Sequence, residues 1–276
     1  MTIIDGKALS AEIRAELKEK IQRLDRKPGL AVIIVGEDSA SQIYVRNKIK
    51  ACGELGIRSY SYTLPETASQ AELESLLDNL AKDDDVDGIL LQMPLSKHLD
   101  SDAAVARIPF EKDVDGFTAK NLGLLLQHKE KTVACTPLGV MKMLEKYGID
   151  PTGKRAVILG RSETVGKPMA MLLLNANATV TICHSRTHNF KEVCKEADIL
   201  VAAVGKANFV TADMVKEGAV VIDIGMNRDD NGKLCGDVDF NNVKEKASYI
   251  TPVPGGVGPM TITMLMYNTY LAACKE

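Results

Sequence analysis

The chain has 276 residues, of which 45% are hydrophobic and 26% charged, and its formal net charge is −3. Such a composition is typical of a globular protein with one large domain or two ordinary ones. The small negative charge, the absence of Trp and the 4% of aromatic residues argue against a nucleic-acid partner and against binding to an acidic membrane surface.

The beginning of the chain, MTIIDGKALSAEIR, does not have the pattern of a signal peptide, and no run of 18 apolar residues follows anywhere. The six cysteines are scattered, without a CxxC pair and without a Cys/His spacing that suits zinc. We therefore expect a cytoplasmic protein with reduced thiols, no membrane span and no metal.

Strands and helices alternate in the first part of the chain. Apolar residues at helical spacing, from Ile13 to Leu24, predict a first helix. Strands are then expected over residues 30–36, 57–64 and 88–95, and helices over 39–55, 69–82 and 100–108. Continuous apolar strands between helices predict a parallel sheet that is covered on both faces.

The periodicity is lost over residues 110–137, which is typical of a domain junction, and a helix over 137–147 is expected to cross it. Alternation then resumes, with strands over 155–160, 178–184, 197–205 and 218–225, and with helices from Gly166, near Lys191, near Asp213 and at the C-terminal end. The sequence thus predicts two α/β blocks, whose ligands are expected at the carboxyl ends of the strands.

The turn GRSETVGKP in the second block has features of a dinucleotide site. Gly160 would permit a tight turn after the strand, and Gly166 would let a helix N-terminus approach a phosphate. The spacing is not GxGxxG, so an ordinary strand–turn–helix remains the alternative.

The next strand ends in CHSRT, without the acidic residue that an NAD site places there. Ser185 and Arg186, together with Arg161, would suit the 2′-phosphate of NADP, although Arg186 could equally be a solvated loop residue. Glycine-containing strand ends at AVGKAN (202–208) and DIGMNR (223–228) are expected to line the nicotinamide side.

In the first block, Tyr44 and Lys48 are spaced to share one face of a helix, with Ser41 one turn earlier. The YxxxK pattern is also found in short-chain dehydrogenases, but there it follows the glycine turn, whereas here it precedes it. A surface lysine beside Arg46 and Lys50 is the alternative for Lys48.

Three further polar residues lie at predicted strand ends or in loops. Gln92 ends a buried strand, where its amide can bind an amine or a ligand or satisfy the backbone. Asp113 and Asp115 belong to KDVDGF, for which turn chemistry is the alternative because DG is a strong turn dipeptide.

The segment ITPVPGGVGPMT contains three prolines and three glycines between Thr251 and Thr261. Neither helices nor strands favour this composition in their interior. A stiff loop that permits close backbone approach, followed by a final helix that Pro259 helps to start, is expected here.

Taken together, the chain resembles the bifunctional methylenetetrahydrofolate dehydrogenase/cyclohydrolase family. The motifs that carry the resemblance are VGEDSASQIYVRNKIKACGELGI, DGILLQMPLSKH, PFEKDVDGF, CTPLGVMKML, GRSETVGKPMAMLL, ATVTICHSRT, DILVAAVGK, VVIDIGMN, GDVDF and ITPVPGGVGPMTITMLM. The resemblance implies an N-terminal three-layer α/β catalytic domain (1–139 with 256–276), a Rossmann-type NADP-binding domain (140–255) and a homodimer.

The resemblance also implies oxidation of 5,10-methylenetetrahydrofolate by NADP⁺ and hydrolysis of the methenyl product to 10-formyltetrahydrofolate, reactions of one-carbon metabolism that serve purine, methionine and histidine biosynthesis. It implies that Lys48 is the general acid/base, that Gln92 positions it, that Tyr44 stacks on the folate rings, and that Asp115 anchors the pterin. Further substrate contacts would come from Ser41, Gly255 and Pro259. The cofactor residues would be Gly160, Arg161, Ser162, Val165, Gly166, Ser185, Arg186, Gly205, Ile224 and Thr261.

Two departures from the family pattern lie near the junction, namely TAKNLG after KDVDGF and Ala134 in place of a common proline. The alternatives are a dehydrogenase without cyclohydrolase activity, a two-domain oxidoreductase like shikimate dehydrogenase, and a nucleotide-sensing protein without turnover. Retention of Lys48 and Gln92 favours both folate activities.

Overall fold

The computed structural model describes residues 1–36 and 39–274, without the side chains of 39–41. Its chain divides into two compact units: unit 1 consists of Met1–Ala11 and Thr136–Thr261, and unit 2 of Glu12–Cys135 and Ile262–Glu276. The domain boundaries expected from the sequence assign residues 1–11, 136–139 and 256–261 differently, and they stay a prediction. None of the helices in the described part of the chain is long and apolar enough to cross a membrane.

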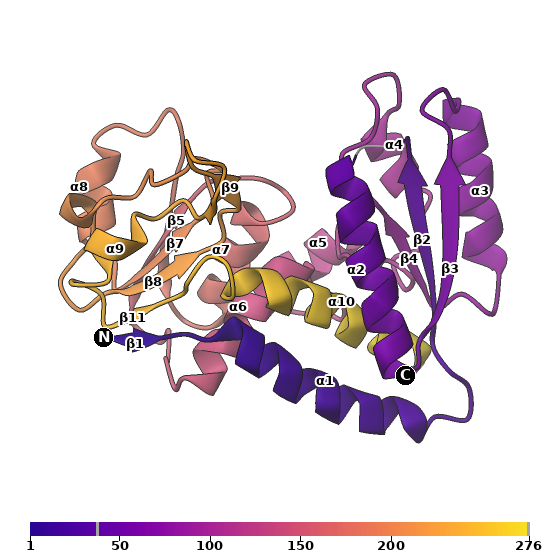
Figure 1. The fold of residues 1–276 in the computed structure, drawn as a ribbon, viewed down its shortest axis with the longest axis horizontal. Helices are drawn as coiled ribbons and strands as arrows, with labels where there is room; N and C mark the ends of the chain where they lie inside the picture. The colour runs from indigo at the N-terminus through magenta and orange to yellow at the C-terminus, as the bar shows by residue number, and fades with distance from the viewer. Residues whose placement is uncertain (37–38, 275–276) are drawn as a thin grey trace. The chain divides into compact units, whose positions relative to one another are not determined.

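Unit 1 contains a six-stranded parallel sheet in the order β1-β11-β8-β7-β5-β6 (Figure 1). The central strands consist of apolar residues because helices cover both faces. The strands are β1 (Thr2–Ile3), β5 (Arg155–Leu159), β6 (Thr179–Cys183), β7 (Ile199–Ala202), β8 (Val220–Asp223) and β11 (Tyr249–Ile250).

The two faces of this sheet are buried by different helices. Val157, Leu200 and Val221 point to one face and share a core cluster with residues of α8 (Phe190–Lys195) and α9 (Phe240–Val243). The helix α7 (Gly166–Asn175) contacts β5 and β6 and buries Met169, Ala170 and Leu173. Burial of each large apolar side chain stabilises the fold by about 1.5–3 kcal/mol.

Several small elements of unit 1 differ from the expectation. The helix predicted near Asp213 is only a 3₁₀ turn, η1 (Ala212–Met214), because the chain turns again before an α-helical bond can form. The edge strand β1, its neighbour β11, and the antiparallel pair β9 (Asn227–Arg228) and β10 (Leu234–Cys235) were not predicted, because two-residue strands carry no periodicity.

Unit 2 contains a three-stranded parallel sheet in the order β3-β2-β4. Its strands are β2 (Gly29–Val35), β3 (Arg58–Leu64) and β4 (Gly88–Leu91). The helix α3 (Gln70–Lys82) covers one face through Leu73, Leu77 and Leu80, while α2 (Ser39–Leu55) contacts β2 and β3. α3 begins at a capping box in which Ser69 and Glu72 exchange hydrogen bonds.

The junction between the blocks is more ordered than its sequence suggests. Residues 119–126 form α5 (Ala119–Leu126), whose N-cap is Thr118, and α6 (Cys135–Lys146) begins two residues earlier than expected. The predicted helix over 100–108 is reduced to α4 (Ser101–Val105). The short length of α5 and its internal Gly123 explain why no helical pattern was recognised.

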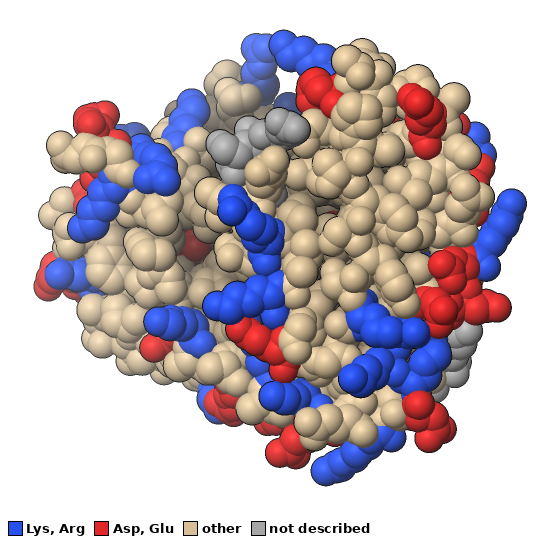
Figure 2. Space-filling view, turned by 45° about the vertical axis from the view of Figure 1, so that its right-hand side comes forward, with Lys and Arg blue, Asp and Glu red and all other residues tan. Residues whose placement is uncertain are grey.

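The remaining long helices are α1 (Gly6–Gln22) and α10 (Val257–Ala273), and each begins in unit 1 and ends in unit 2. Within unit 2, Met266 of α10 contacts Cys52 of α2, with the two sulfur atoms 3.6 Å apart. On the face of the molecule drawn in Figure 2, basic and acidic side chains are intermixed, in keeping with the small net charge.

Candidate active site

In unit 2, the side chains of Lys48 and Gln92 meet. Lys48 lies on α2, and its Nζ donates a hydrogen bond of 3.0 Å to Oε1 of Gln92, which directly follows β4. The Gln92 Nε2 donates to the Met93 carbonyl at 2.7 Å, so the amide presents its oxygen to the lysine. Lys48 is half-buried and is therefore not the solvated surface lysine of the alternative interpretation.

Tyr44 lies one turn before Lys48 on α2, and 40% of its surface is exposed. An exposed aromatic ring next to a half-buried amine provides a flat apolar surface for a ligand ring. Ser41, which was predicted to be a polar contact, lies outside the residues whose side chains are described.

The two aspartates of KDVDGF have different environments. Asp113 is buried and accepts hydrogen bonds from the backbone of the turn and from Asn121, so for this residue the turn-chemistry alternative is correct. Asp115 has no such set of donors among the described residues. Burial raises the pKa of Asp115 to about 6, and the positive charge of Lys48 opposes that rise. Lys48, Gln92 and Asp115 thus form one polar group in unit 2.

Two residues that the sequence did not single out support Asp115. The Sγ of Cys135 lies 3.8 Å from Oδ1 of Asp115. Asn268 of α10 is 2% exposed, and its Nδ2 donates to the carbonyl oxygens of Val114 at 2.9 Å and Val133 at 3.0 Å. Asn268 therefore ties together the backbone next to Asp115 and the backbone next to Cys135. Its position as an amide within the apolar run TITMLMYNTYLAA was a signal that the sequence offered.

In unit 1, the glycine turn after β5 is packed too tightly for any side chain. Gly160 has φ +118°, and a Cβ there would lie 2.2 Å from the Ala203 carbonyl oxygen. A Cβ at Gly166 would lie 2.4 Å from the carbonyl oxygen of Gly160. Gly166 is therefore required for packing of α7 against its own turn, which is a reason that the sequence interpretation did not include.

The first turn of α7 is held by Ser162, whose hydroxyl accepts hydrogen bonds from the backbone N–H groups of Val165 and Gly166, both at 3.2 Å. Val165 is the N-cap residue and provides no side-chain cap. The hydroxyl of Ser162 can still donate to a ligand, and the dipole of α7 favours a negative charge at this end.

Exposed basic residues follow both β5 and β6, which are neighbours in the sheet. Arg161 and Arg186 are exposed, and in the part of the chain that the structure describes neither guanidinium has an ion-pair or hydrogen-bond partner. Ser185 is also exposed, and the backbone around it is shaped by bonds from the His184 N–H to Thr187 and from the Arg186 N–H to His184. Two unengaged cations without a nearby acid at the end of β6 fit a phosphate-rich cofactor.

The other predicted cofactor residues in this unit lie at the ends of β7 and β8. Gly205 has φ +68°, and its N–H donates to Asp237. The Ile224 N–H donates to the Ala202 carbonyl at 2.9 Å. Both residues therefore lie at the C-terminal ends of the strands, as the glycine turn does.

The proline- and glycine-rich loop and the N-terminal part of α10 form hydrogen bonds with α1 and α6. The Gly255 carbonyl accepts a hydrogen bond from the Lys7 N–H at 2.9 Å, and the Pro259 carbonyl accepts one from the Ser10 hydroxyl at 3.4 Å. The hydroxyl oxygens of Thr261 and Thr136 lie 2.9 Å apart. A Cβ at Gly6 would lie 1.9 Å from the Gly256 carbonyl oxygen, so backbone segments meet directly here.

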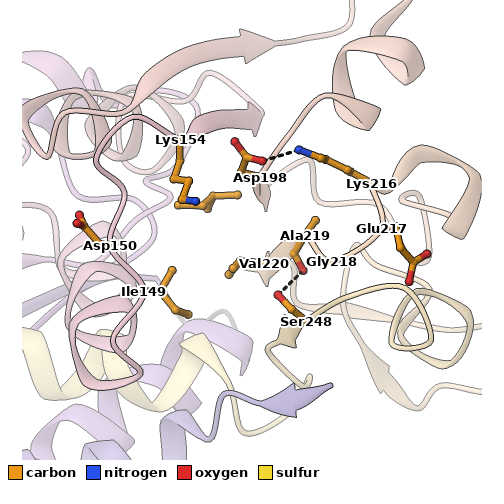
Figure 3. A pocket seen from close by; sticks show the side chains of 11 residues that line it. Ile149, Asp150, Lys154, Asp198, Lys216, Glu217, Gly218, Ala219, Val220 and Ser248 are labelled. Carbon is orange, nitrogen blue, oxygen red and sulfur yellow. Dashed lines mark hydrogen bonds and ion pairs between the residues drawn. The ribbon is translucent and has the colours of Figure 1, made fainter.

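At the opposite, N-terminal ends of the strands of the six-stranded sheet lies a pocket of about 240 Å³, lined by both charged and apolar residues (Figure 3). There Lys216 donates to Asp198 at 2.6 Å, and Asp198 also accepts from the Arg155 N–H at 2.9 Å. These contacts tie strand ends together, and no predicted site residue lies among them.

Comparison with known proteins matches the sequence to two family models. The family model described as "Tetrahydrofolate dehydrogenase/cyclohydrolase, catalytic domain" matches residues 4–115, and the one described as its "NAD(P)-binding domain" matches residues 134–276. A "Bifunctional protein FolD" of Campylobacter curvus is 58% identical over 276 residues, which cover 99% of this chain and 96% of the relative.

Solved structures are similar over the whole chain. The crystal structure of the bifunctional enzyme FolD-methylenetetrahydrofolate dehydrogenase/cyclohydrolase from Campylobacter jejuni has a TM-score of 0.98 at 52% identity and covers 99% of both chains. That of the Trypanosoma brucei methylenetetrahydrofolate dehydrogenase-cyclohydrolase, complexed with NADP cofactor and inhibitor, has a TM-score of 0.94 at 38% identity and covers 100% of this chain and 99% of that one. Since both family models match and a full-length relative is more than half identical, this chain belongs to the tetrahydrofolate dehydrogenase/cyclohydrolase family.

Proposed function

We propose that the chain is a bifunctional enzyme of one-carbon metabolism. It oxidises 5,10-methylenetetrahydrofolate to the 5,10-methenyl cation with NADP⁺, and it hydrolyses that cation to 10-formyltetrahydrofolate. Family membership over the full chain supports both reactions, and the Trypanosoma brucei structure, which is a complex with NADP, supports the cofactor.

NADP⁺, when bound, accepts the hydride that leaves the methylene carbon of the folate. In unit 1, Arg161 and Arg186 would hold its phosphate charges, and Ser162 and Ser185 would donate hydroxyl hydrogen bonds. Gly160, Val165 and Gly166 form the backbone turn. Gly205, Ile224 and Thr261 are the remaining residues that we propose for this site.

Lys48 is the general acid/base of the hydrolysis. In its neutral form the amine accepts a proton from the water that adds to the methenyl carbon. The resulting ammonium then donates that proton to the folate nitrogen, and the carbon–nitrogen bond of the ring breaks. The hydroxyl left on the carbon gives up its own proton to solvent and becomes the carbonyl oxygen of the formyl group, so hydrolysis of the cation releases one proton. Lys48 returns to its neutral form at the end of the reaction.

Gln92 and Asp115 determine where the lysine acts. Gln92 accepts a hydrogen bond from the Lys48 Nζ and thereby fixes the position of the amine. Asp115 offers acceptor oxygens to the N–H groups of the pterin. Tyr44 offers its exposed ring for stacking, and Ser41, Gly255 and Pro259 are the other folate contacts that we propose.

The observation that carries the cyclohydrolase assignment is the 3.0 Å bond between Lys48 and Gln92, together with the half-buried carboxyl of Asp115, whose pKa the charge of Lys48 affects. The test is turnover of methylenetetrahydrofolate with NADP⁺ by the wild type and by Lys48→Met, with NADPH and the methenyl product followed separately. We expect the variant to form NADPH but to hydrolyse the methenyl product at least about 100-fold more slowly, as for loss of a general acid/base.

Lys50→Met is the matched control, because Lys50 is on the same helix, has a 78% exposed side chain and only a 3.9 Å ion pair with Glu54. It should leave both rates unchanged. Hydrolysis at the wild-type rate by Lys48→Met would remove Lys48 from the mechanism. A wild type that binds NADP⁺ but forms no NADPH would instead support a binding protein without turnover.

We also propose a cytoplasmic homodimer with the domain boundaries 1–139 and 256–276, and 140–255. The support is the resemblance to the family and, for the compartment, six cysteines without a disulfide among the described residues. Sedimentation equilibrium tests the dimer, and a molar mass near the 29.9 kDa of one chain at micromolar concentration would contradict it.

A further inference from the structure

Two buried carboxylates in unit 1 have no part in the mechanism described above. Asp223 ends β8 and is 3% exposed, and Asp237 precedes α9 and is 0% exposed. Among the residues that the structure describes, neither has a Lys or Arg partner. A buried carboxylate is costly unless several donors satisfy its oxygens, so these two residues need a structural reason.

The side chain of Asp237 binds the loop that leaves β7. Its Oδ2 accepts hydrogen bonds from the N–H groups of Val204 at 2.6 Å and Gly205 at 3.1 Å, and its Oδ1 accepts one from the Lys206 N–H at 2.9 Å. The Nδ2 of Asn227 donates to the same Oδ1 at 2.9 Å. One carboxylate thus holds three successive backbone amides, an arrangement in which negative charge is stabilised.

Asp223 in turn holds the backbone of Asp237. Its Oδ1 accepts from the N–H groups of Gly225 and Asp237, and its Oδ2 accepts from the Val238 N–H, all at 2.9 Å. Burial raises the pKa of Asp223 to about 6, while these backbone bonds lower it. At pH 7.5 the carboxylate is therefore ionised and accepts all three bonds.

Glycines make room for both carboxylates. A Cβ at Gly236 would lie 1.8 Å from Oδ2 of Asp223, and a Cβ at Gly225 would lie 2.3 Å from Oδ1 of Asp237. The motifs DIGMN and GDVDF, which had entered the sequence interpretation mainly as marks of the family, are therefore complementary halves of one buried network.

The loop that Asp237 holds lies against the glycine turn. The Ala203 N–H donates to the Leu159 carbonyl at 2.8 Å, and the Ala203 carbonyl oxygen is the atom that excludes a Cβ at Gly160. A shift of residues 204–206 would move Ala203 and with it the wall of the turn. The network therefore extends to the glycine turn that we propose as part of the cofactor-binding site.

We infer that Asp237 is a positioning residue of the NADP site, where its carboxylate fixes the loop 204–206 against the glycine turn, and that Asp223 fixes Asp237. The inference rests on the proposed cofactor roles of Gly160 and Gly205. Asp237 does not touch the cofactor in this scheme, and it acts through the backbone that it holds.

The test is Asp237→Asn, which keeps the shape of the side chain but replaces one acceptor oxygen by a donor group that faces backbone N–H groups. NADP⁺ affinity is measured by calorimetry, and kcat and KM are measured for both reactions. We expect the Kd and KM for NADP⁺ to rise about tenfold or more, because a buried charge-assisted set of bonds is lost. The hydrolysis of methenyltetrahydrofolate, which takes up no cofactor, should change much less.

Asp198→Asn is the matched control, because Asp198 also accepts a backbone N–H and also lies in unit 1, but at the opposite, N-terminal ends of the strands (Figure 3). It should leave the Kd for NADP⁺ unchanged. If Asp237→Asn does not fold, Asn227→Ala removes a single donor to the same carboxylate, and we expect a smaller rise of the Kd, about threefold.

An unchanged Kd for NADP⁺ in Asp237→Asn, or in Asn227→Ala where only that variant folds, overturns the inference. An equal rise in Asp198→Asn overturns it too, because the effect would then be general loosening of the unit. A wild type that neither binds NADP⁺ nor forms NADPH contradicts the proposed function itself, whereas a wild type that binds it normally leaves only the role of Asp237 in question.

Discussion

Asp113 and Asp115 are two residues apart, yet their carboxylates have opposite surroundings. Asp113 accepts hydrogen bonds from three backbone N–H groups and from Asn121, which makes it a structural residue of the turn. Asp115 is held beside Lys48 in a site where burial raises its pKa to about 6. A substitution of each by its amide should therefore affect stability in opposite directions.

Asp115→Asn should stabilise the protein at neutral pH while it weakens folate binding. Because the pKa of Asp115 is raised from 3.8 to about 6, its contribution to the free energy of unfolding is fully present below about pH 4 and is lost as the pH rises to about 6. The amide does not titrate, so the stability of the variant relative to wild type should grow by about 1.4 kcal/mol between pH 5 and pH 7.5.

Urea unfolding at the two pH values measures this difference in the free energy of unfolding between variant and wild type. Asp113→Asn is the contrasting variant. It should destabilise the protein at both pH values by about 1–3 kcal/mol, since an amide cannot accept all the bonds that Asp113 accepts. If the free energies of unfolding of Asp115→Asn and wild type differ by the same amount at pH 5 and pH 7.5, the carboxyl of Asp115 does not titrate in this range. The KM for methylenetetrahydrofolate should rise in Asp115→Asn, in keeping with the proposed pterin contact.

The residues of this site show how much of it could be predicted from the sequence. Lys48 and Gln92 were identified because helical spacing and a strand end are local features, and the structure brings them together at 3.0 Å. Cys135, Asn268 and Asp237 were not, because the contacts that give these residues a role follow from no local pattern of helix or strand. The Asn268 amide, for example, binds the Val114 carbonyl across 154 positions. A periodic pattern within one helix or strand cannot reveal such a contact.

Among the elements, the segment from β5 to α7 depends on its glycines more than on its helix propensity. Gly166 is the first residue of α7, and a Cβ there would lie 2.4 Å from the Gly160 carbonyl oxygen and 2.9 Å from the Cα of Arg161. Because both neighbours are backbone atoms, a side chain cannot be accommodated by a change of rotamer. The turn itself would have to move.

Gly166→Ala should therefore raise the KM for NADP⁺ about tenfold and lower the free energy of unfolding by about 1–3 kcal/mol, as overpacking does. Gly53→Ala is the matched control, because Gly53 lies within α2 with an ordinary φ, and a Cβ added there would have no atom within 4 Å. That variant should instead be more stable by about 0.5–1 kcal/mol. Thermal unfolding and initial rates of NADPH formation check both variants. An unchanged KM for NADP⁺ in Gly166→Ala would show that the turn does not contribute to cofactor binding.

Long elements were predicted well and short ones poorly, for physical reasons. α2 and α3 each have many residues on a repeating apolar face, so their bounds follow from the sequence. α5 is an eight-residue helix with an internal glycine, and η1 is a single turn. β1 consists of two exposed residues, and its existence depends on β11, which is almost the whole chain away.

For the whole molecule, the path of the chain determines how the two units respond to a ligand. The chain passes from one unit to the other at residues 11/12, 135/136 and 261/262. The first and the last of these points fall inside α1 and α10, whereas the second lies at the N-terminal end of α6. To unfold one unit alone would require α1 and α10 to break at an internal position, where the backbone hydrogen bonds of both sides would be lost.

We therefore expect the chain to unfold in a single transition, and we expect NADP⁺ to shift that transition as a whole although its proposed ligands lie only in unit 1. With NADP⁺ at 100 times its Kd, the free energy of unfolding should rise by about 2.7 kcal/mol, as linkage requires for a ligand that binds only the folded state. Differential scanning calorimetry, with the calorimetric and van't Hoff enthalpies compared, measures this directly. Asp237→Asn at the same NADP⁺ concentration should show a smaller shift, because its affinity is lower. Two resolved transitions, of which NADP⁺ moves only one, would mean that the shared helices fail to couple the units, and the two activities could then be lost at different temperatures.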